Sequence, residues 1–134
     1  MWIYKGKEFT SENIGEYKAF VYLITNLVTG KKYIGKKRFT KMRTKPPLKG
    51  KVRKRKVTSE SDWLSYYGSN EELKQDVKEL GESSFKREIL RLCTSLTEAS
   101  YYEAKEQFDR EVLLTEEYYN SWIQVKVRSL PTQK

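Results

Sequence analysis

Two apolar stretches determine the fold of this chain: Ala19-Phe-Val-Tyr-Leu-Ile-Thr25 and the shorter Lys32-Tyr-Ile-Gly35. The first is rich in aromatic and β-branched residues, which favour extended backbone, and the second resumes the same character. Residues 26–30, Asn-Leu-Val-Thr-Gly, lie between them and supply turn chemistry. The sequence therefore predicts a β-hairpin over residues 19–35.

A helix and a further strand are predicted after residue 68. Ser69-Asn-Glu-Glu72 fits a capping box. Leu73, Val77 and Leu80 then repeat at helical spacing until Gly81, which is a typical helix stop. Residues 85–93 follow with β-branched and aromatic content, and we expect them to form a strand.

A longer helix is predicted from a second capping box, Ser95 to Glu98. Its expected buried stripe consists of Tyr101, Ala104, Phe108 and Val112. Residues 122–127 are expected to form a strand or a short helix.

These elements predict one α/β domain over residues 1–134, with a small three-stranded, mostly antiparallel sheet flanked by helices. Residues 1–18 are expected to form an N-terminal arm, 44–58 a basic loop insertion and 121–134 a C-terminal extension. A helix could begin in the basic segment after Gly35, but Pro46 and Pro47 would end it.

Composition excludes several kinds of chemistry. The 134 residues contain no histidine and one cysteine, Cys93, so serine–histidine and cysteine–histidine pairs and zinc sites built from both residues are ruled out. Any metal would have to be held by carboxylates and water. Cys93 itself fits a buried small apolar residue. The apolar runs are too short for a membrane span and the start of the chain has no signal-peptide pattern, so we expect a cytoplasmic protein.

The positive charge is concentrated in one block. The formal net charge is +9, from 27 basic and 18 acidic residues. Residues 31–56 hold 14 of the basic residues, and no acidic residue occurs between Glu16 and Glu60. Neutralising phosphates releases condensed counterions, so such a block favours binding to nucleic acid over the alternative of a merely solvated loop.

The hairpin resembles the paired tripeptides of the GIY-YIG nuclease superfamily, with Tyr22 and Tyr33 as the two tyrosines. The second tripeptide matches fully, whereas Phe20 and Val21 replace the glycine and isoleucine of the first. Arg43 follows Tyr33 by ten residues, where the family places its catalytic arginine. Residues 61–69 also look like a stretch of phage-encoded relatives. The resemblance covers about residues 19–121 and suggests a phage-type, stand-alone member similar to homing endonucleases.

The resemblance implies hydrolysis of a DNA phosphodiester with Mg²⁺ or Mn²⁺. In family terms Tyr22 is the general base, with a pKa lowered by a nearby metal or cation, and Tyr33 positions water or phosphate. Arg43 would clamp the phosphate with its guanidinium fork, and Arg38 is the alternative. The expected substrate is double-stranded DNA. We expect the protein to be a monomer or homodimer and to have no membrane partner. If the chain is phage-encoded, the expected compartment is the bacterial host cell.

Two glutamates compete for the role of metal ligand. Glu103 and Glu106 lie three residues apart, and both are expected to point away from the predicted apolar stripe. Glu103 is favoured because the local Tyr-Glu-Ala pattern resembles relatives, whereas Glu106 better fits the distance to Asn120. Both could instead be solvated helix carboxylates. One carboxylate with several waters is adequate for Mg²⁺.

Further residues are expected to contact DNA. Trp63, Tyr66 and Tyr67 could stack on bases, but aromatic residues at this spacing more often form core. Asn120 is expected to bind a backbone or phosphate group, with a helix cap as the alternative. The predicted DNA contacts are Lys36, Lys37, Arg38, Lys41, Lys45, Lys49, Lys51, Arg53, Lys54, Arg55, Lys56 and Asn120. The alternative to a nuclease is a catalytically inactive, basic nucleic-acid-binding protein of the same fold, and a weaker alternative is a small RNA- or ribosome-associated protein.

Overall fold

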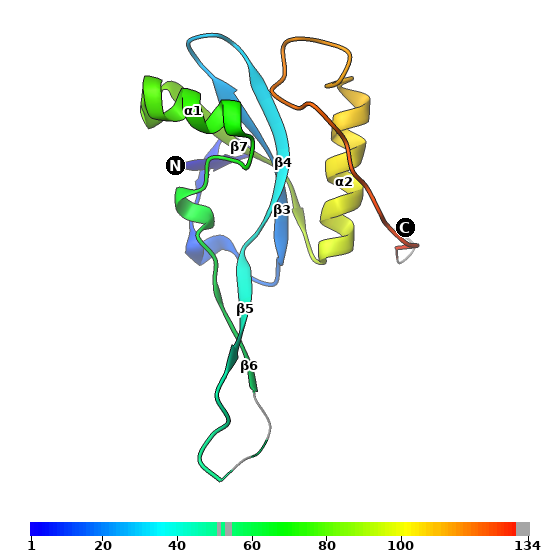
Figure 1. Cartoon of the computed structure of the whole chain (residues 1–134). Coiled ribbons are helices and arrows are strands. Elements are labelled where there is room, and N and C mark those ends of the chain that lie inside the picture. The colour runs from blue at the N-terminus through cyan, green and yellow to red at the C-terminus, as the bar shows by residue number, and fades with distance from the viewer. Residues whose placement is uncertain (51, 53–54, 131–134) are drawn as a thin grey trace.

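A five-stranded sheet with one helix on each face forms the body of the protein, and a two-stranded hairpin projects from it (Figure 1). The computed structural model describes residues 1–50, 52 and 55–130, and for residues 43–45 and 55–57 only the backbone is described. The strands are β1 (Trp2–Tyr4), β2 (Lys7–Phe9), β3 (Ala19–Asn26), β4 (Lys32–Arg38), β5 (Thr40–Lys45), β6 (Arg55–Glu60) and β7 (Phe85–Cys93). The helices are α1 (Glu71–Leu80) and α2 (Leu96–Asp109), with short 3-10 turns at Ser11–Asn13, Trp63–Ser65 and Glu82–Ser84.

The sheet has the strand order β2-β1-β7-β3-β4. The predicted hairpin is confirmed, because β3 pairs antiparallel with β4, and β7 pairs antiparallel with the other side of β3. The expected sheet of three strands is wrong in number, because the N-terminal arm adds two more. β1 pairs parallel with β7, with Trp2 opposite Arg87, and β2 pairs antiparallel with β1. Each added strand has only three residues, which is too few to show a periodicity.

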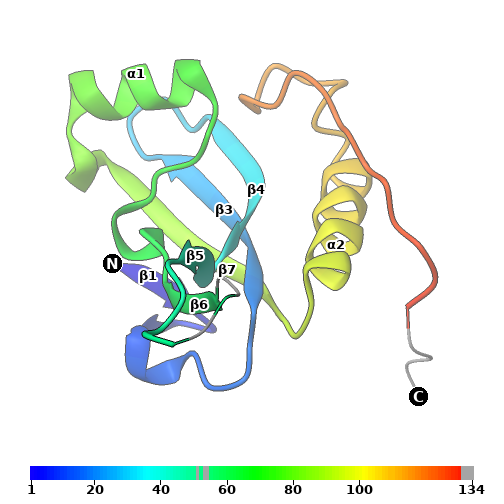
Figure 2. The same ribbon diagram turned by 60° about the horizontal axis from the view of Figure 1, so that its bottom comes forward.

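The interior strand β3 is buried on both faces of the sheet, which explains its nearly continuous apolar run. Phe20, Tyr22 and Ile24 pack in the cluster that also contains Leu73 of α1. The alternate residues Ala19, Val21 and Leu23 pack with Ala99 of α2. α1 and α2 therefore cover opposite faces, as Figures 1 and 2 show.

Both predicted helix starts are present. In α1 the capping residue is Asn70, whose side chain accepts a hydrogen bond from the Leu73 amide at 3.0 Å, one position later than the predicted Ser69. Gly81 ends this helix with a φ of 87°, a conformation that glycine adopts without strain. Ser95 caps α2 by accepting a hydrogen bond from the Glu98 amide at 3.0 Å.

The predicted buried stripe of α2 is right for two of its four residues. Ala104 and Val112 are buried as expected, whereas Tyr101 and Phe108 are 42% and 59% exposed. Ala99 and Gln107 are buried beside Ala104 instead. The small side chains of the two alanines allow α2 to approach β3 and β4 closely. This rotation of the helix brings Glu103, one turn before Gln107, to the side that faces the sheet.

The basic segment forms a hairpin. The expected helix after Gly35 is wrong, and residues 44–45 and 55–58 of the expected loop belong to strands β5 and β6, which pair antiparallel. The β-branched residues Thr40, Thr44 and Val57 favour this extended conformation. Pro46 and Pro47 follow the last residue of β5, where they do not interrupt the ladder. The hairpin extends away from the sheet in Figure 1 and comes forward in Figure 2.

The segment after α2 returns to the outer edge of β4, the edge that does not pair with β3. The Lys32 amide donates to the Glu117 carbonyl at 2.9 Å, and the Tyr119 amide donates to the Lys32 carbonyl at 2.7 Å. Residues 122–127 form neither the expected strand nor the expected helix. They run as an extended segment beside α2 (Figures 1 and 2). Within the described part of the chain, no helix combines the length and the apolar character that a membrane crossing requires.

Candidate active site

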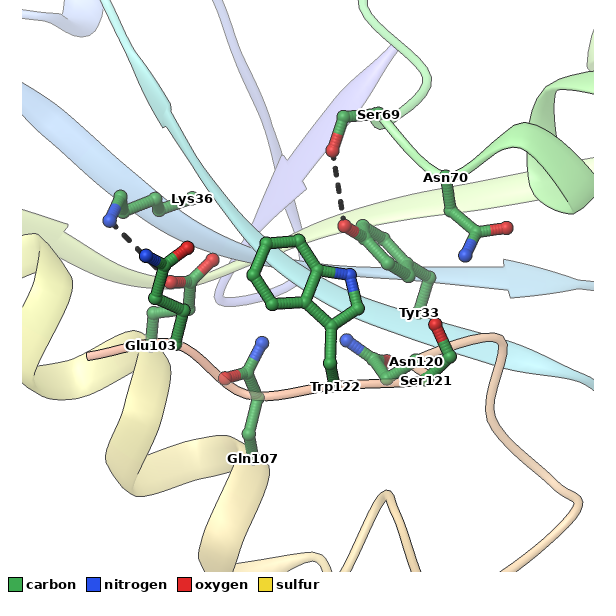
Figure 3. Close-up of a pocket in the computed structure, with 10 residues that line it drawn as sticks. Tyr33, Lys36, Ser69, Asn70, Glu103, Gln107, Asn120, Ser121 and Trp122 are labelled. Atoms are coloured by element: carbon green, nitrogen blue, oxygen red, sulfur yellow. Dashed lines mark hydrogen bonds and ion pairs between the residues drawn. The ribbon is translucent and has the colours of Figure 1, made fainter.

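A cavity of about 320 Å³ lies between β4, the start of α1, α2 and the C-terminal segment (Figure 3). It brings together four of the predicted site residues, Tyr33 and Lys36 of β4, Glu103 of α2 and Asn120 of the C-terminal segment. The lining residues that the sequence does not predict are Ser69, Asn70, Gln107, Ser121, Trp122 and Gln124.

Glu103 supplies the only carboxylate among the described residues that line the cavity. Its side chain is 16% exposed, and this burial raises the pKa of the carboxyl group. The ammonium of Lys36, 3.6 Å from Oε1, and the Lys36 backbone N–H lower the pKa by a smaller amount. Lys36 is held in turn by a 3.0 Å hydrogen bond to Ser100 Oγ. A carboxylate and a cation therefore share one wall of the cavity.

Glu106 has a different environment. Its Oε2 lies 2.9 Å from Nε of Arg110, one turn further along the same helix, and Glu106 does not line the cavity. The two glutamates, expected on one face of the helix, thus have different surroundings. Only Glu103 is placed to serve the cavity.

Tyr33 reaches the cavity with its hydroxyl group. The hydroxyl lies 3.2 Å from Ser69 Oγ, which joins β4 to the segment before α1. Burial raises the pKa of Tyr33, and the hydrogen bond with Ser69 offsets part of this effect. At neutral pH the group is therefore a protonated phenol that can donate a hydrogen bond.

Tyr22 lies behind Tyr33 in the core. It is 1% exposed, and the two ring centroids are 6.2 Å apart. Burial raises the pKa of Tyr22 well above its usual value, and the neighbouring Tyr66, Tyr33 and Glu103 raise it further. None of the described residues that shift this pKa is a cation, so lowering of the Tyr22 pKa by a bound metal stays a prediction.

Asn120 binds the protein's own backbone. Its amide oxygen accepts from the Ile34 N–H at 3.0 Å, and its amide nitrogen donates to the Ile34 carbonyl at 2.9 Å. Gln107 donates to the same carbonyl at 3.2 Å. The alternative helix cap is wrong, because the amide bonds the backbone of β4 and no helix end. The predicted contact of Asn120 with DNA stays a prediction.

The predicted DNA-contacting cations near the cavity differ in their surroundings. Lys37 is paired with Asp62 at 2.6 Å, and its ammonium lies 4.2 Å from the centre of the Tyr66 ring. Arg38 and Lys41 are exposed. Together with Lys36 these residues border a second groove of about 500 Å³ beside the start of α2. The positive surface therefore continues from the cavity toward β5.

The projecting hairpin carries the remaining predicted cations. The Arg43 backbone pairs with Val57 in the hairpin, while its side chain lies outside the described residues, as do the side chains of Lys45, Arg55 and Lys56. Lys51, Arg53 and Lys54 lie wholly outside them, and Lys49 is exposed. The phosphate-clamping role of Arg43 thus stays a prediction.

The aromatic residues before α1 belong to the core cluster that contains Tyr22 or pack against it. Trp63 is fully buried, as the core interpretation predicts, and its Nε1 donates to Glu60 Oε1 at 2.7 Å. The buried Arg87 donates to the carbonyls of Leu64 and Tyr66 at 3.0 and 2.9 Å. These bonds fix the segment that leads to Ser69. Cys93 is buried as expected, and burial raises the pKa of its thiol to about 12.

The sequence prediction missed several residues of the cavity, above all Gln107 and Trp122. Gln107 could have been found, because it lies one helical turn after Glu103 and shares its face. Trp122 gave no such signal. It belongs to an irregular segment whose position depends on the contacts of residues 117–120 with β4.

The donor set of the cavity fits a magnesium ion that keeps most of its water. Within the described ranges, no three Asp, Glu or Cys side chains cluster as a metal site. The cavity instead offers one carboxylate, Glu103, with the phenol of Tyr33 and the amide of Gln107 nearby. Mg²⁺ prefers oxygen donors and retains several waters, so this limited set is compatible with it.

Two tyrosines on the paired strands β3 and β4, and a glutamate on the helix packed beside them, are the arrangement that the resemblance to GIY-YIG nucleases implies. A family model described as "Putative endonuclease segE, GIY-YIG domain" matches residues 2–123. The chain therefore belongs to the segE-type GIY-YIG domain family.

A curated relative has the same description. "Putative endonuclease segE" of Enterobacteria phage T4 is 34% identical over 103 residues. The match covers 75% of this chain and 39% of the relative's length. The chain therefore corresponds to well under half of that relative. No solved structure matches this chain.

Proposed function

We propose that this protein is an endonuclease that hydrolyses phosphodiester bonds of double-stranded DNA in the cavity of Tyr33, Lys36 and Glu103. The observation that carries the proposal is the meeting of a buried carboxylate, an ammonium group and a phenol on the walls of one cavity. The family membership and the basic segment that begins at the same strand support it.

Glu103 is the residue we expect to hold Mg²⁺ or Mn²⁺. When bound, such an ion supplies positive charge beside the phosphate and promotes ionisation of water. The raised pKa of Glu103 is a sign that its negative charge is incompletely compensated by Lys36. A cation at this carboxylate would complete the compensation.

Lys36 and Tyr33 are expected to contact the phosphate. The Lys36 ammonium can neutralise a non-bridging oxygen, and the Tyr33 hydroxyl can donate a hydrogen bond to that group or to the attacking water. Because Tyr33 lines the cavity while Tyr22 is buried, we assign the direct contact to Tyr33. Tyr22 then acts as a positioning residue behind β4. Arg43 is the proposed phosphate clamp.

Conversion of supercoiled plasmid in the presence of Mg²⁺ or Mn²⁺ tests this function. The wild type should nick or linearise the plasmid, and Tyr33→Phe, Arg43→Ala and Glu103→Gln should each slow cleavage. Cleavage that is insensitive to all three substitutions would refute the proposed site. DNA binding without cleavage by the wild type would instead favour the inactive nucleic-acid-binding protein.

A further inference from the structure

The most exposed tryptophan of the protein stands at the candidate active site. Trp122 is 67% exposed and lines the cavity, whereas Trp2 and Trp63 are buried in the core. In Figure 3 the indole of Trp122 is drawn between Tyr33 and Ser69 on one side and Glu103 and Gln107 on the other. Burial of a large apolar ring is favourable, so a ligand that covers this exposed indole would gain binding free energy.

Trp122 is held in place from both sides along the chain. Two residues earlier, Asn120 makes paired hydrogen bonds to the Ile34 backbone at 3.0 and 2.9 Å. One residue later, Ile123 packs against the core cluster that contains Val21 and Val112. The backbone of Trp122 is therefore anchored, and the exposure of its ring is not the result of a loose segment.

The cavity next to this ring has the charge that a phosphate requires. Lys36 carries its ammonium into the same cavity and borders the second groove, where Arg38 and Lys41 are exposed. An aromatic face beside a cationic track is the combination that binds unpaired nucleotides, because bases stack on the ring while phosphates follow the cations. Neither a free phosphate nor a peptide needs both features.

We propose that Trp122 stacks on an unpaired or extruded nucleobase next to the phosphate held at the cavity. The inference rests on the proposed function in one respect, since it takes DNA to be the ligand. A base inside an intact duplex has no free face, so the proposal implies that the bound DNA is locally unstacked at this position. Trp122 thereby becomes a substrate-positioning contact of the nuclease.

Intrinsic fluorescence tests the proposal separately from cleavage. The test uses the Glu103→Gln variant, so that DNA stays intact, and a single-stranded oligonucleotide of about 12 nucleotides. An abasic strand of equal length serves as the matched probe, because it keeps the phosphates and lacks the bases. We expect the normal strand to quench the emission of the exposed tryptophan and to bind more tightly than the abasic strand.

Two substitutions, each made in the Glu103→Gln variant, test whether Trp122 is the tryptophan that the DNA quenches. Trp122→Phe should abolish the quenching while keeping most of the affinity, because a phenyl ring still stacks. Trp122→Ala should weaken binding of the normal strand by about 5- to 150-fold, the equivalent of about 1–3 kcal/mol per stacked base, with little effect on the abasic strand. Circular dichroism should show both variants folded, since the side chain is mostly exposed.

Equal affinity for the two strands, or quenching that survives Trp122→Phe, would overturn the proposal. Tighter binding by Trp122→Ala would also overturn it and would show that the ring obstructs the cavity. A wild type that never cleaves DNA but shows Trp122-dependent quenching would contradict the proposed function and leave the stacking contact intact.

Discussion

Gly35 lies directly beneath the ring of Tyr22, its cross-strand neighbour, so closely that a Cβ atom at residue 35 would be 2.6 Å from Cζ of Tyr22. The same Cβ would be 3.0 Å from Cε2 of Tyr33. The glycine of the Tyr-Ile-Gly motif is thus required by the two tyrosines that accompany it. The three residues form one packed unit, and their joint occurrence has a steric cause.

Gly35→Ala should therefore destabilise the fold by about 1–3 kcal/mol, the usual cost of overpacking a core. The urea midpoint measures this effect. Adding Tyr22→Phe should reduce the cost of the alanine, because removing the hydroxyl relieves part of the overlap. A Gly35→Ala variant as stable as the wild type would contradict the packing described here.

Substitution of the two glutamates of α2 should affect DNA cleavage differently. Glu103→Gln should reduce cleavage by about 100-fold or more, since a bound metal contributes several kcal/mol to transition-state stabilisation. Glu106→Gln is the matched control. It removes only a partly exposed ion pair with Arg110, worth about 0.3–0.5 kcal/mol, and should leave cleavage unchanged. Equal loss of cleavage in both variants would exclude Glu103 as the specific ligand.

The raised pKa of Glu103 predicts a pH dependence of both activity and stability. Cleavage should fall as the pH is lowered through this pKa, at a pH above the usual range of a glutamate, because the protonated carboxyl group no longer holds a cation. A pH profile of cleavage at subsaturating metal measures the midpoint, because a bound cation would itself lower the pKa of the carboxyl group.

Lowering the pH should have the opposite effect on the contribution of Glu103 to stability. Since burial raises the pKa of Glu103, its charged form destabilises the native state at neutral pH, and the carboxyl contributes most to stability at low pH. Glu103→Gln should then be more stable than the wild type at pH 7, and the difference should vanish in acid. Urea titrations at several pH values would expose a Glu103→Gln variant that is instead less stable at neutral pH.

Asn120 should behave as a structural residue. Asn120→Ala removes two buried hydrogen bonds and leaves the Ile34 N–H without its partner, so the free energy of unfolding should fall by about 2 kcal/mol. Ser121→Ala, at the exposed neighbouring position, should have little effect. The affinity for DNA should be the same for the folded Asn120→Ala protein and the wild type; weaker binding by the folded variant would indicate a lost contact with DNA.

The projecting hairpin offers a test of the basic segment. Lys45 pairs with Arg55, so residues 46–54 can be replaced by Asn-Gly, a sequence suited to a two-residue turn between paired strands. The replacement removes Lys49, Lys51, Arg53 and Lys54. If all four contact phosphates, the slope of log K against log salt should become shallower by about 3.6. A full-length variant with glutamine at the four positions separates charge from loop length, and unchanged affinity in both variants would contradict a DNA contact by this segment.

The elements that depend on neighbours in sequence were predicted well. The hairpin of β3 and β4, the strand β7 and the start of α2 follow from local composition and capping signals. β1 was missed because its three residues are held by β7, far along the chain, and a short arm has no periodicity of its own. The apolar pattern of α2 was also misleading, because the helix turns two polar residues, Glu103 and Gln107, toward the sheet. Both line the cavity there, and Gln107 donates to the Ile34 carbonyl.

The outer edge of β4 is closed by groups from distant parts of the chain. The Lys32 backbone bonds residues 117 and 119, Ile34 bonds Asn120, and the Arg38 carbonyl accepts from Ser61 Oγ at 2.6 Å. Tyr33 is synthesised before residues 120–124, so the cavity around it is complete only when those later residues have left the ribosome. During translation, a chain that already exposes its basic segment still lacks one wall of the candidate active site.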